Sequence, residues 1–224
     1  MANKVHLVAC GFAFLFLVTG CLELGFSLIA RNMMDDAPTR GEEAIRHLIY
    51  QRLPLTAGIA NGAFIIVTFL LALPALTMPN RGLLKMAGGA VTFCGLFSLC
   101  VGVYIWVMTL RIRGAFEAIY RDQEPDVHDL VQSEFNCCGY ANSSSPAFVT
   151  NQQCPSPAAA ALIRGCSGPV SQFATVTLDN LFTALFGMVG IHALFIVTLA
   201  CLHKDRKERE RYRHIDEKSG FSNI

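Results

Sequence analysis

Charged residues are absent, or nearly so, from four long windows of this chain. The first window, 5–30, contains a single charge, Glu23, and the windows 53–80, 86–110 and 180–202 contain none. Each exceeds the roughly 20 apolar residues with which a helix crosses a hydrocarbon core. Because lipid offers the backbone no hydrogen-bond partner, a spanning segment must be helical. The pattern therefore predicts four transmembrane helices.

These windows divide the chain into alternating spans and connecting segments. The predicted segments are an N-terminal tip (1–4), a first span (5–30), a small loop (31–53), a second span (54–78), a short turn (79–85), a third span (86–110), a large loop (111–176), a fourth span (177–202) and a tail (203–224). A signal peptide is the alternative for the first window. The apolar run of the window 5–30 is longer than the roughly 7–15 apolar residues of a signal peptide, and no A-x-A-like cleavage site follows it. We therefore expect this window to be a retained helix.

The composition excludes an ordinary soluble domain. Hydrophobic residues make up 53% of the 224 residues and charged residues only 16%, against roughly 25% charged residues in soluble proteins. The net charge of +1 and the absence of zinc-finger or basic-region spacing also argue against binding to nucleic acid.

Basic residues and cysteines predict the orientation. The tip, the short turn and the tail together hold 10 of the 18 Lys and Arg residues, so both termini are expected to be cytoplasmic and both loops extracellular. The large loop contains four of the nine cysteines, Cys137, Cys138, Cys154 and Cys166. An even number suits disulfides in an oxidising compartment, although four cysteines permit three connectivities. Asn142 begins an Asn-Ser-Ser sequon in the same loop, a candidate glycosylation site.

The first half of the large loop is predicted to be helical. The third span should continue as a helix beyond the membrane through Phe116, Ile119 and Tyr120 until Pro125 ends it. A second short helix should follow, because apolar residues recur at helical spacing between Val127 and Phe135. The segment 140–165, rich in Ser, Pro, Asn and Ala, is too short for a core of its own and should take its shape from the disulfides.

Directly after that second helix stands Cys137-Cys138-Gly139. A vicinal Cys-Cys-Gly in the second outer loop of a four-pass chain resembles the signature of the tetraspanin family. The resemblance covers the whole chain, and it implies an all-α membrane protein: a bundle of four transmembrane helices with a small, helical, disulfide-stapled extracellular domain between the third and fourth. It also implies the disulfides Cys137–Cys166 and Cys138–Cys154. The compact loop with four cysteines is similar to fungal tetraspanins associated with host penetration by infection structures (appressoria).

Three polar residues lie inside the predicted spans: Glu23, Asn61 and His192. Glu23 and Asn61 each lie 8 residues from an outer boundary, about 12 Å deep in a helix. We expect a protonated Glu23 to form a hydrogen bond with Asn61, because neither side chain would otherwise avoid lipid. The alternative is that Glu23 reaches up to the headgroups. His192 is interpreted as a packing residue, with a proton relay as the alternative. Tetraspanins commonly carry other polar residues at comparable depths, so the lining of the family's sterol cavity is not transferred here.

Cytoplasmic sites are predicted near the ends of the spans. Cys201 is the first candidate for palmitoylation and Cys10 the second, while Cys21, Cys94 and Cys100 are interpreted as packing residues. Tyr212 and Ile215 fit a Y-x-x-Φ sorting motif. The basic tail should favour the anionic inner leaflet, and its charge pairs should support a short helix.

No catalytic pattern is present in the sequence. It contains no phosphate loop, no HExxH motif and no Gly-x-Ser-x-Gly elbow. His47 and His128 are interpreted as isolated loop histidines, and no metal or cofactor is expected. The sequence thus favours a non-enzymatic scaffold in the plasma membrane or in endosomal or vacuolar membranes.

The partners expected of such a scaffold are other membrane proteins, bound through the large loop and the spans, and membrane lipids. Sterol and a second copy of the chain are further candidates, and no nucleic acid is expected. A small channel or transporter and a junction or adhesion protein are the alternative functions. Claudin-like junction proteins place the large disulfide loop first, whereas here it is second.

Overall fold

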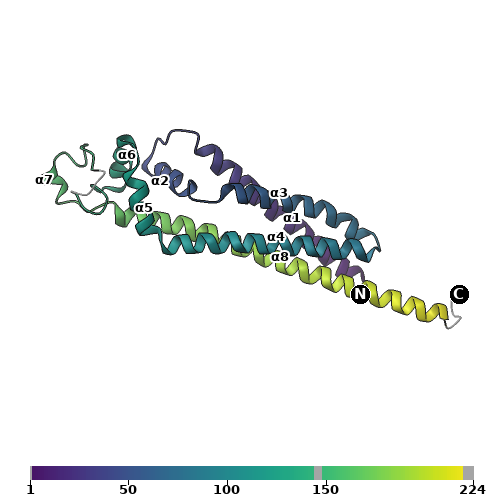
Figure 1. Ribbon diagram of the computed structural model, residues 1–224. Coiled ribbons are helices and arrows are strands. Elements are labelled where there is room, and N and C mark those ends of the chain that lie inside the picture. The colour runs from purple at the N-terminus through teal and green to yellow at the C-terminus, as the bar shows by residue number, and fades with distance from the viewer. Residues whose placement is uncertain (1, 144–147, 219–224) are drawn as a thin grey trace. The chain divides into compact units, whose positions relative to one another are not determined.

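The computed structural model describes residues 2–143 and 148–218, and these residues form helices and loops without a strand (Figure 1). The helices in chain order are α1 (Ala2–Met33), α2 (Gly41–Tyr50), α3 (Leu55–Thr77), α4 (Arg81–Leu110), α5 (Ile112–Arg121), α6 (Pro125–Phe135), α7 (Pro157–Ala160) and α8 (Ser167–Lys218). The expected all-α fold is confirmed.

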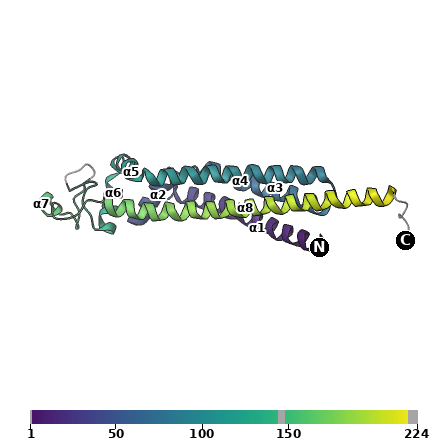
Figure 2. The same ribbon diagram turned by 90° about the horizontal axis from the view of Figure 1, so that it is seen from below.

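Within residues 2–143 and 148–218, four helices are long and apolar enough to cross a membrane. The candidate spans are Lys4–Met33, Leu55–Thr77, Arg81–Leu110 and Ser167–Ile215, so each predicted span lies on one helix. The fourth helix extends well beyond its predicted span at both ends, as the unbroken ribbon of α8 shows (Figure 2). The charge pairs of the tail, including Asp205 with Arg209 at 3.0 Å, therefore belong to α8 itself and not to a separate short helix.

The chain forms two compact units. The first, here the bundle unit, comprises Met1–Phe26, Thr56–Val101 and Leu185–Ile224, and the second, the loop unit, comprises Ser27–Leu55 and Gly102–Ala184. The core of the bundle unit contains side chains from α1, α3, α4 and α8. Its buried members are Ala9, Ala13, Phe16, Ile65, Ala72, Ala75, Leu76, Leu84, Ala87, Val91, Cys94, Phe195, Leu199 and Leu202.

Within the bundle unit, α1 and α3 approach closely at two glycines. A Cβ atom added to Gly62 would lie 2.8 Å from the backbone nitrogen of Leu24, and one added to Gly20 would lie 2.5 Å from Cγ2 of Ile65. Small residues permit such contact where lipid supplies no hydrophobic drive for association. The packing of α1 against α3 therefore depends on the absence of side chains at these positions.

The helix that follows the third span differs from the prediction. It breaks at Arg111 (φ −105°, ψ 4°), and α5 then ends at Arg121. Pro125 does not end a helix but begins α6, where a proline costs no helical hydrogen bond. The break is explained by packing: α5 buries Phe116, Ile119 and Tyr120 along one face. Such an amphipathic stripe needs a protein partner, which outweighs the local preference for an unbroken helix.

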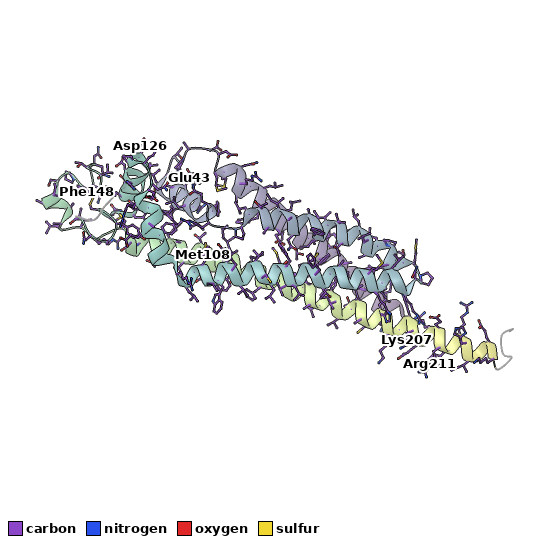
Figure 3. The ribbon with its side chains drawn as sticks, viewed as in Figure 1. Glu43, Met108, Asp126, Phe148, Lys207 and Arg211 are labelled. Atoms are coloured by element: carbon purple, nitrogen blue, oxygen red, sulfur yellow. A yellow bond between two sulfur atoms is a disulfide. The ribbon has the colours of Figure 1, made fainter. Side chains whose placement is uncertain are left out.

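The small loop contains α2, which the sequence analysis did not predict. Glu43 lies in its first turn and accepts hydrogen bonds from the backbone N–H (3.1 Å) and the hydroxyl (2.8 Å) of Thr39. These bonds lower the pKa of Glu43. The helix contacts α6 within the loop unit, where Glu43 and Asp126 of α6 are labelled in Figure 3. The small loop is thus a packed part of this unit.

We predict that Gly62→Ala destabilises the bundle, because the added methyl group must push α1 away from α3. Overpacking of this kind costs about 1–3 kcal/mol, which SDS-induced unfolding of the purified protein would measure. Gly88→Ala is the matched control, since a Cβ there meets nothing within 4 Å. Equal stability of the two variants would show that the glycine contact does not hold α1 and α3 together.

Candidate functional site

The loop unit contains two disulfides that diverge from adjacent residues. Cys137 is bonded to Cys166 and Cys138 to Cys154, the same pairs that the family resemblance implied. The first joins the end of α6 to the start of α8, and the second closes the shorter loop between Cys138 and Cys154. Each disulfide contributes about 2–4 kcal/mol by restricting the unfolded chain.

The backbone around the two cysteines explains how neighbours can bond in different directions. Asn136 ends α6 in the left-handed conformation (φ 49°), and Gly139 has φ 61°, a region that glycine enters without steric cost. The N–H of Cys138 donates to the carbonyl of Arg164 at 3.0 Å, and the N–H of Cys166 donates to that of Gly139, also at 3.0 Å. The third residue of the motif therefore supplies a backbone conformation that the disulfides require.

Gln132 connects this turn to the segment that follows, and the sequence analysis missed it. Its buried amide donates to the carbonyl of Val149 at 2.8 Å, while its Oε1 accepts from the N–H groups of Val149 (3.2 Å) and Gly139 (3.4 Å). The sequence did contain a signal for this role: Gln132 lies at helical spacing on the same helix face as His128 and Val131, which are also buried. A glutamine on the buried face of an amphipathic helix needs polar partners.

The segment 148–165 does bury a small core, contrary to the prediction. Cys138, Cys154 and Ala160 are buried, with Phe148 and Ile163 packed against them, and Phe148 is labelled in Figure 3. The expected dependence on the disulfides still applies, because two of the three buried residues form one. In contrast, Leu162 is 90% exposed. Four further exposed residues of this segment are small or apolar, Pro155, Pro157, Ala158 and Ala161, while Arg164 beside them is exposed as well. We refer to Leu162 and the four small or apolar residues as the apolar tip.

Aromatic rings pack against one another inside the loop unit. The ring of Tyr120 lies 4.6 Å from that of His128 and 5.1 Å from that of Tyr140, between centroids. His128 is buried and donates to the carbonyl of Tyr120 at 2.6 Å, so its interpretation as an isolated loop histidine is wrong. Burial raises the pKa of Tyr140 to about 12 and also raises that of Tyr120. Both phenols are therefore neutral at physiological pH and serve as packing groups.

In the bundle unit, the structure brings Glu23 and Asn61 together. The amide of Asn61 donates to both carboxyl oxygens of Glu23, at 3.1 and 3.0 Å, and to the hydroxyl of Ser98 at 2.7 Å. All three side chains are buried, so Glu23 does not reach toward the headgroups. The cluster joins α1, α3 and α4. Ser98 was not predicted, because a single serine in an apolar window gives no signal of its own.

His192 belongs to a separate contact in the same unit. Its Nε2 lies 2.9 Å from the hydroxyl of Thr19, which itself donates to the carbonyl of Phe16 at 2.7 Å. The imidazole therefore donates to Thr19. Its ring also lies edge-on to that of Phe16, with 4.8 Å between centroids. This position agrees with a packing role that links α1 and α8.

The remaining predicted sites lie on exposed surfaces. Cys201 and Cys10 are exposed, as are Cys21 and Cys100, whereas Cys94 is buried; the interpretation of Cys21 and Cys100 as packing residues is therefore wrong within this chain. Tyr212 and Ile215 are exposed on α8. Asn142 is exposed, while Ser144 of its sequon lies outside the described residues. Across residues 2–143 and 148–218, no group of three or more His, Cys, Asp or Glu side chains is placed to hold a metal ion.

Comparison with known proteins gives one match. The model of the Tetraspanin family matches residues 5–205, which is most of the 224-residue chain. The matched region includes the four candidate spans, apart from the ends of the first and last, and both disulfides. Neither the curated proteins nor the solved structures gave a match.

We predict that Glu23→Gln leaves the stability of the bundle unchanged, whereas Glu23→Ala lowers it. A glutamine oxygen accepts from Asn61 as a neutral carboxylic acid does, but alanine removes an acceptor from a buried amide, at a cost of about 1–3 kcal/mol. SDS-induced unfolding of both variants gives the comparison. If Glu23→Gln is as unstable as Glu23→Ala, Glu23 acts as a charged carboxylate and the prediction of a protonated side chain is wrong.

Proposed function

This chain belongs to the tetraspanin family and is a multi-pass membrane protein, and on that premise we propose that it is a non-enzymatic scaffold that organises partner membrane proteins laterally. The partners bind through the loop unit and along the spans. The observation that carries this proposal is the apolar tip, an exposed hydrophobic surface on a backbone fixed by disulfides.

The physical argument concerns the cost of exposing Leu162. A leucine side chain gains about 1.5–3 kcal/mol when it is removed from water, yet Leu162 is 90% exposed in a unit that buries other apolar residues. A neighbouring disulfide and the cap of α7, where the Ser156 hydroxyl accepts from the N–H of Ala159 at 3.2 Å, hold this segment in place. A preorganised apolar surface of this kind loses little conformational entropy when a partner covers it.

The orientation is part of the proposal. The distribution of Lys and Arg supports a cytoplasmic location for both termini. The loop unit is then extracellular, which suits its disulfides. The exposure of Cys201 and Cys10 supports palmitoylation at the cytoplasmic end, and that of Asn142 supports glycosylation. The exposed Tyr212 and Ile215 support sorting between the plasma membrane and endosomal or vacuolar membranes.

Finer roles remain proposals. The compact loop with four cysteines supports a function in host penetration by fungal infection structures. Sterol binding and self-association stay predictions, which the exposed apolar faces of the spans permit.

We predict that Leu162→Ser removes partners from the purified complex. If Leu162 is the central hot spot of the interface, its substitution costs about 2 kcal/mol, roughly a 30-fold loss of affinity. The measurement is quantitative crosslinking mass spectrometry of the full chain, purified from its native membranes in mild detergent. Asp126→Ser is the matched control, since Asp126 is exposed in the same unit but lies outside the apolar tip.

The expected result is a set of membrane proteins that crosslink to the wild type and to Asp126→Ser but not to Leu162→Ser. An identical set for all three proteins would contradict the assignment of the apolar tip as a partner surface. Ion flux through the purified protein in liposomes would instead favour a channel.

A further inference from the structure

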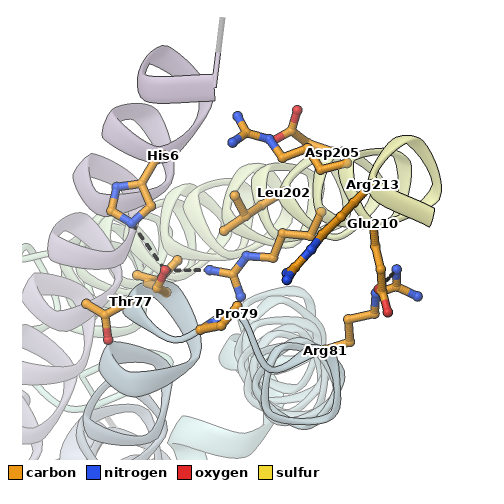
Figure 4. Close-up of a pocket in the computed structure, with 11 residues that line it drawn as sticks. His6, Thr77, Pro79, Arg81, Leu202, Asp205, Glu210 and Arg213 are labelled. Carbon is orange, nitrogen blue, oxygen red and sulfur yellow. Dashed lines mark hydrogen bonds and ion pairs between the residues drawn. The ribbon is translucent and has the colours of Figure 1, made fainter. Parts of the chain in front are cut away.

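A cavity of about 670 Å³ lies at the end of the bundle unit that contains the turn between α3 and α4. Residues of α1, of the end of α3, of that turn, of the start of α4 and of α8 line it, and Figure 4 draws all of them and labels eight. The lining residues are His6, Leu76, Thr77, Pro79, Arg81, Leu202, Asp205, Arg206, Arg209, Glu210 and Arg213. The span of α3 ends at Thr77 and that of α4 begins at Arg81. With these span ends at a membrane boundary, the cavity would lie near the lipid headgroups.

One wall of the cavity is held by Arg206. Its guanidinium donates to the carbonyls of Ala75 (2.9 Å) and Met78 (2.7 Å), and also to that of Leu76. His6 donates to the Leu76 carbonyl as well, at 3.2 Å. The C-terminus of a helix carries about half a negative charge, which would repel an anion. Arg206 offsets this charge and fixes α8 against α3.

The lining as a whole, Arg206 included, carries a positive excess. Four arginines line the cavity against two carboxylates, Asp205 and Glu210, which leaves an excess of +2 with His6 neutral. Each carboxylate is already paired, Asp205 with Arg209 at 3.0 Å and Glu210 with Arg81. No carboxylate of the cavity therefore pairs with Arg206 or Arg213.

Arg213 is the arginine best placed to change partners. Its side chain points back into the cavity in Figure 4. It pairs with the carboxylate of Glu217 at 3.4 Å, which lies outside the lining, and the two side chains are 81% and 50% exposed. Exposed pairs of this kind contribute at most about 1 kcal/mol, so an anion in the cavity can compete for Arg213.

The basic residues of α8 are divided between two faces. Arg206, Arg209 and Arg213 follow one another at i, i+3 and i+7 and line the cavity. Lys204, Lys207 and Arg211 have the same spacing but lie roughly on the opposite face of the helix, at about 100° per residue. Lys207 and Arg211 are labelled in Figure 3. A basic segment that only anchors a span does not need its basic residues on two faces. The arginines on the cavity face are therefore candidates for binding a specific ligand.

We propose that this cavity binds a phosphomonoester group, as carried by a phosphoinositide headgroup or a free inositol phosphate. A phosphomonoester has a charge of about −1.5 to −2 at pH 7, which balances the excess of the lining. Arginine guanidinium groups bind phosphate oxygens through paired N–H donors. Basic pockets beside spans on the cytoplasmic side are suited to such headgroups, and the orientation proposed above places the cavity on that side.

The test measures lipid binding to the full chain, purified in detergent, by native mass spectrometry. The probes are phosphatidylinositol 4,5-bisphosphate, phosphatidylserine and free inositol 1,4,5-trisphosphate. We expect the bisphosphate lipid to bind more tightly than phosphatidylserine, and Arg213→Gln to weaken it about 10-fold, the loss of one charged hydrogen-bonded contact. Arg211→Gln is the matched control, because it removes the same charge from the opposite face of α8, and we expect it to leave binding nearly unchanged.

Two outcomes overturn the proposal: equal weakening by Arg213→Gln and Arg211→Gln, or phosphatidylserine binding as tight as that of the bisphosphate lipid. Either would mean diffuse attraction to negative charge. The soluble probe identifies the source of the ligand in the outcomes that support the site. Equal affinity for inositol trisphosphate indicates a soluble ligand, and much weaker affinity indicates the lipid. Loss of partners in Leu162→Ser is measured separately, so failure of this proposal and failure of the proposed scaffold are distinguishable.

Discussion

The loop unit depends on two covalent bonds that leave adjacent residues in different directions. Cys137 is bonded to the start of α8 and Cys138 to the segment that carries the apolar tip. This divergence requires the chain to turn sharply, which it does through the positive φ angles of Asn136 and Gly139. Gln132 then ties the turn to Val149 through buried hydrogen bonds. A segment with so small a core can present a fixed surface only because these constraints act together.

The bundle unit meets a different constraint, since lipid supplies no hydrophobic drive for helix association. Its helices are joined instead by close backbone approach at Gly62 and by buried polar contacts. The cluster of Glu23, Asn61 and Ser98 joins three helices, and the contact of Thr19 with His192 brings in the fourth. Glu23, Asn61, Ser98, Thr19 and the Nε2 atom of His192 each have a hydrogen-bond partner in these contacts, which offsets the cost of placing them in hydrocarbon. Nδ1 of His192 is buried without one.

Much of the fold could be predicted from the sequence, because charge-free windows of more than about 20 residues leave few alternatives in a membrane protein. The contact of Glu23 with Asn61 followed from equal depth on neighbouring spans. The disulfide pairs came from the family resemblance, since spacing alone permits three connectivities. Tertiary packing determined what was missed. No proline or glycine stands at Arg111, where the helix breaks. The helix α2 forms because it packs against α6. Ser98 and Thr19 form their hydrogen bonds with residues that are distant in the chain, so their own sequence context did not indicate a role.

The account of a scaffold with a rigid partner surface is tested most directly by mapping the disulfides of the protein purified from its membrane without reduction. Peptide mass spectrometry with electron-transfer fragmentation separates the adjacent cysteines. If the two disulfides fix the partner surface, we expect linked peptides for Cys137 with Cys166 and for Cys138 with Cys154. Free thiols at these positions, or the exchanged pairing of Cys137 with Cys154, would contradict this account.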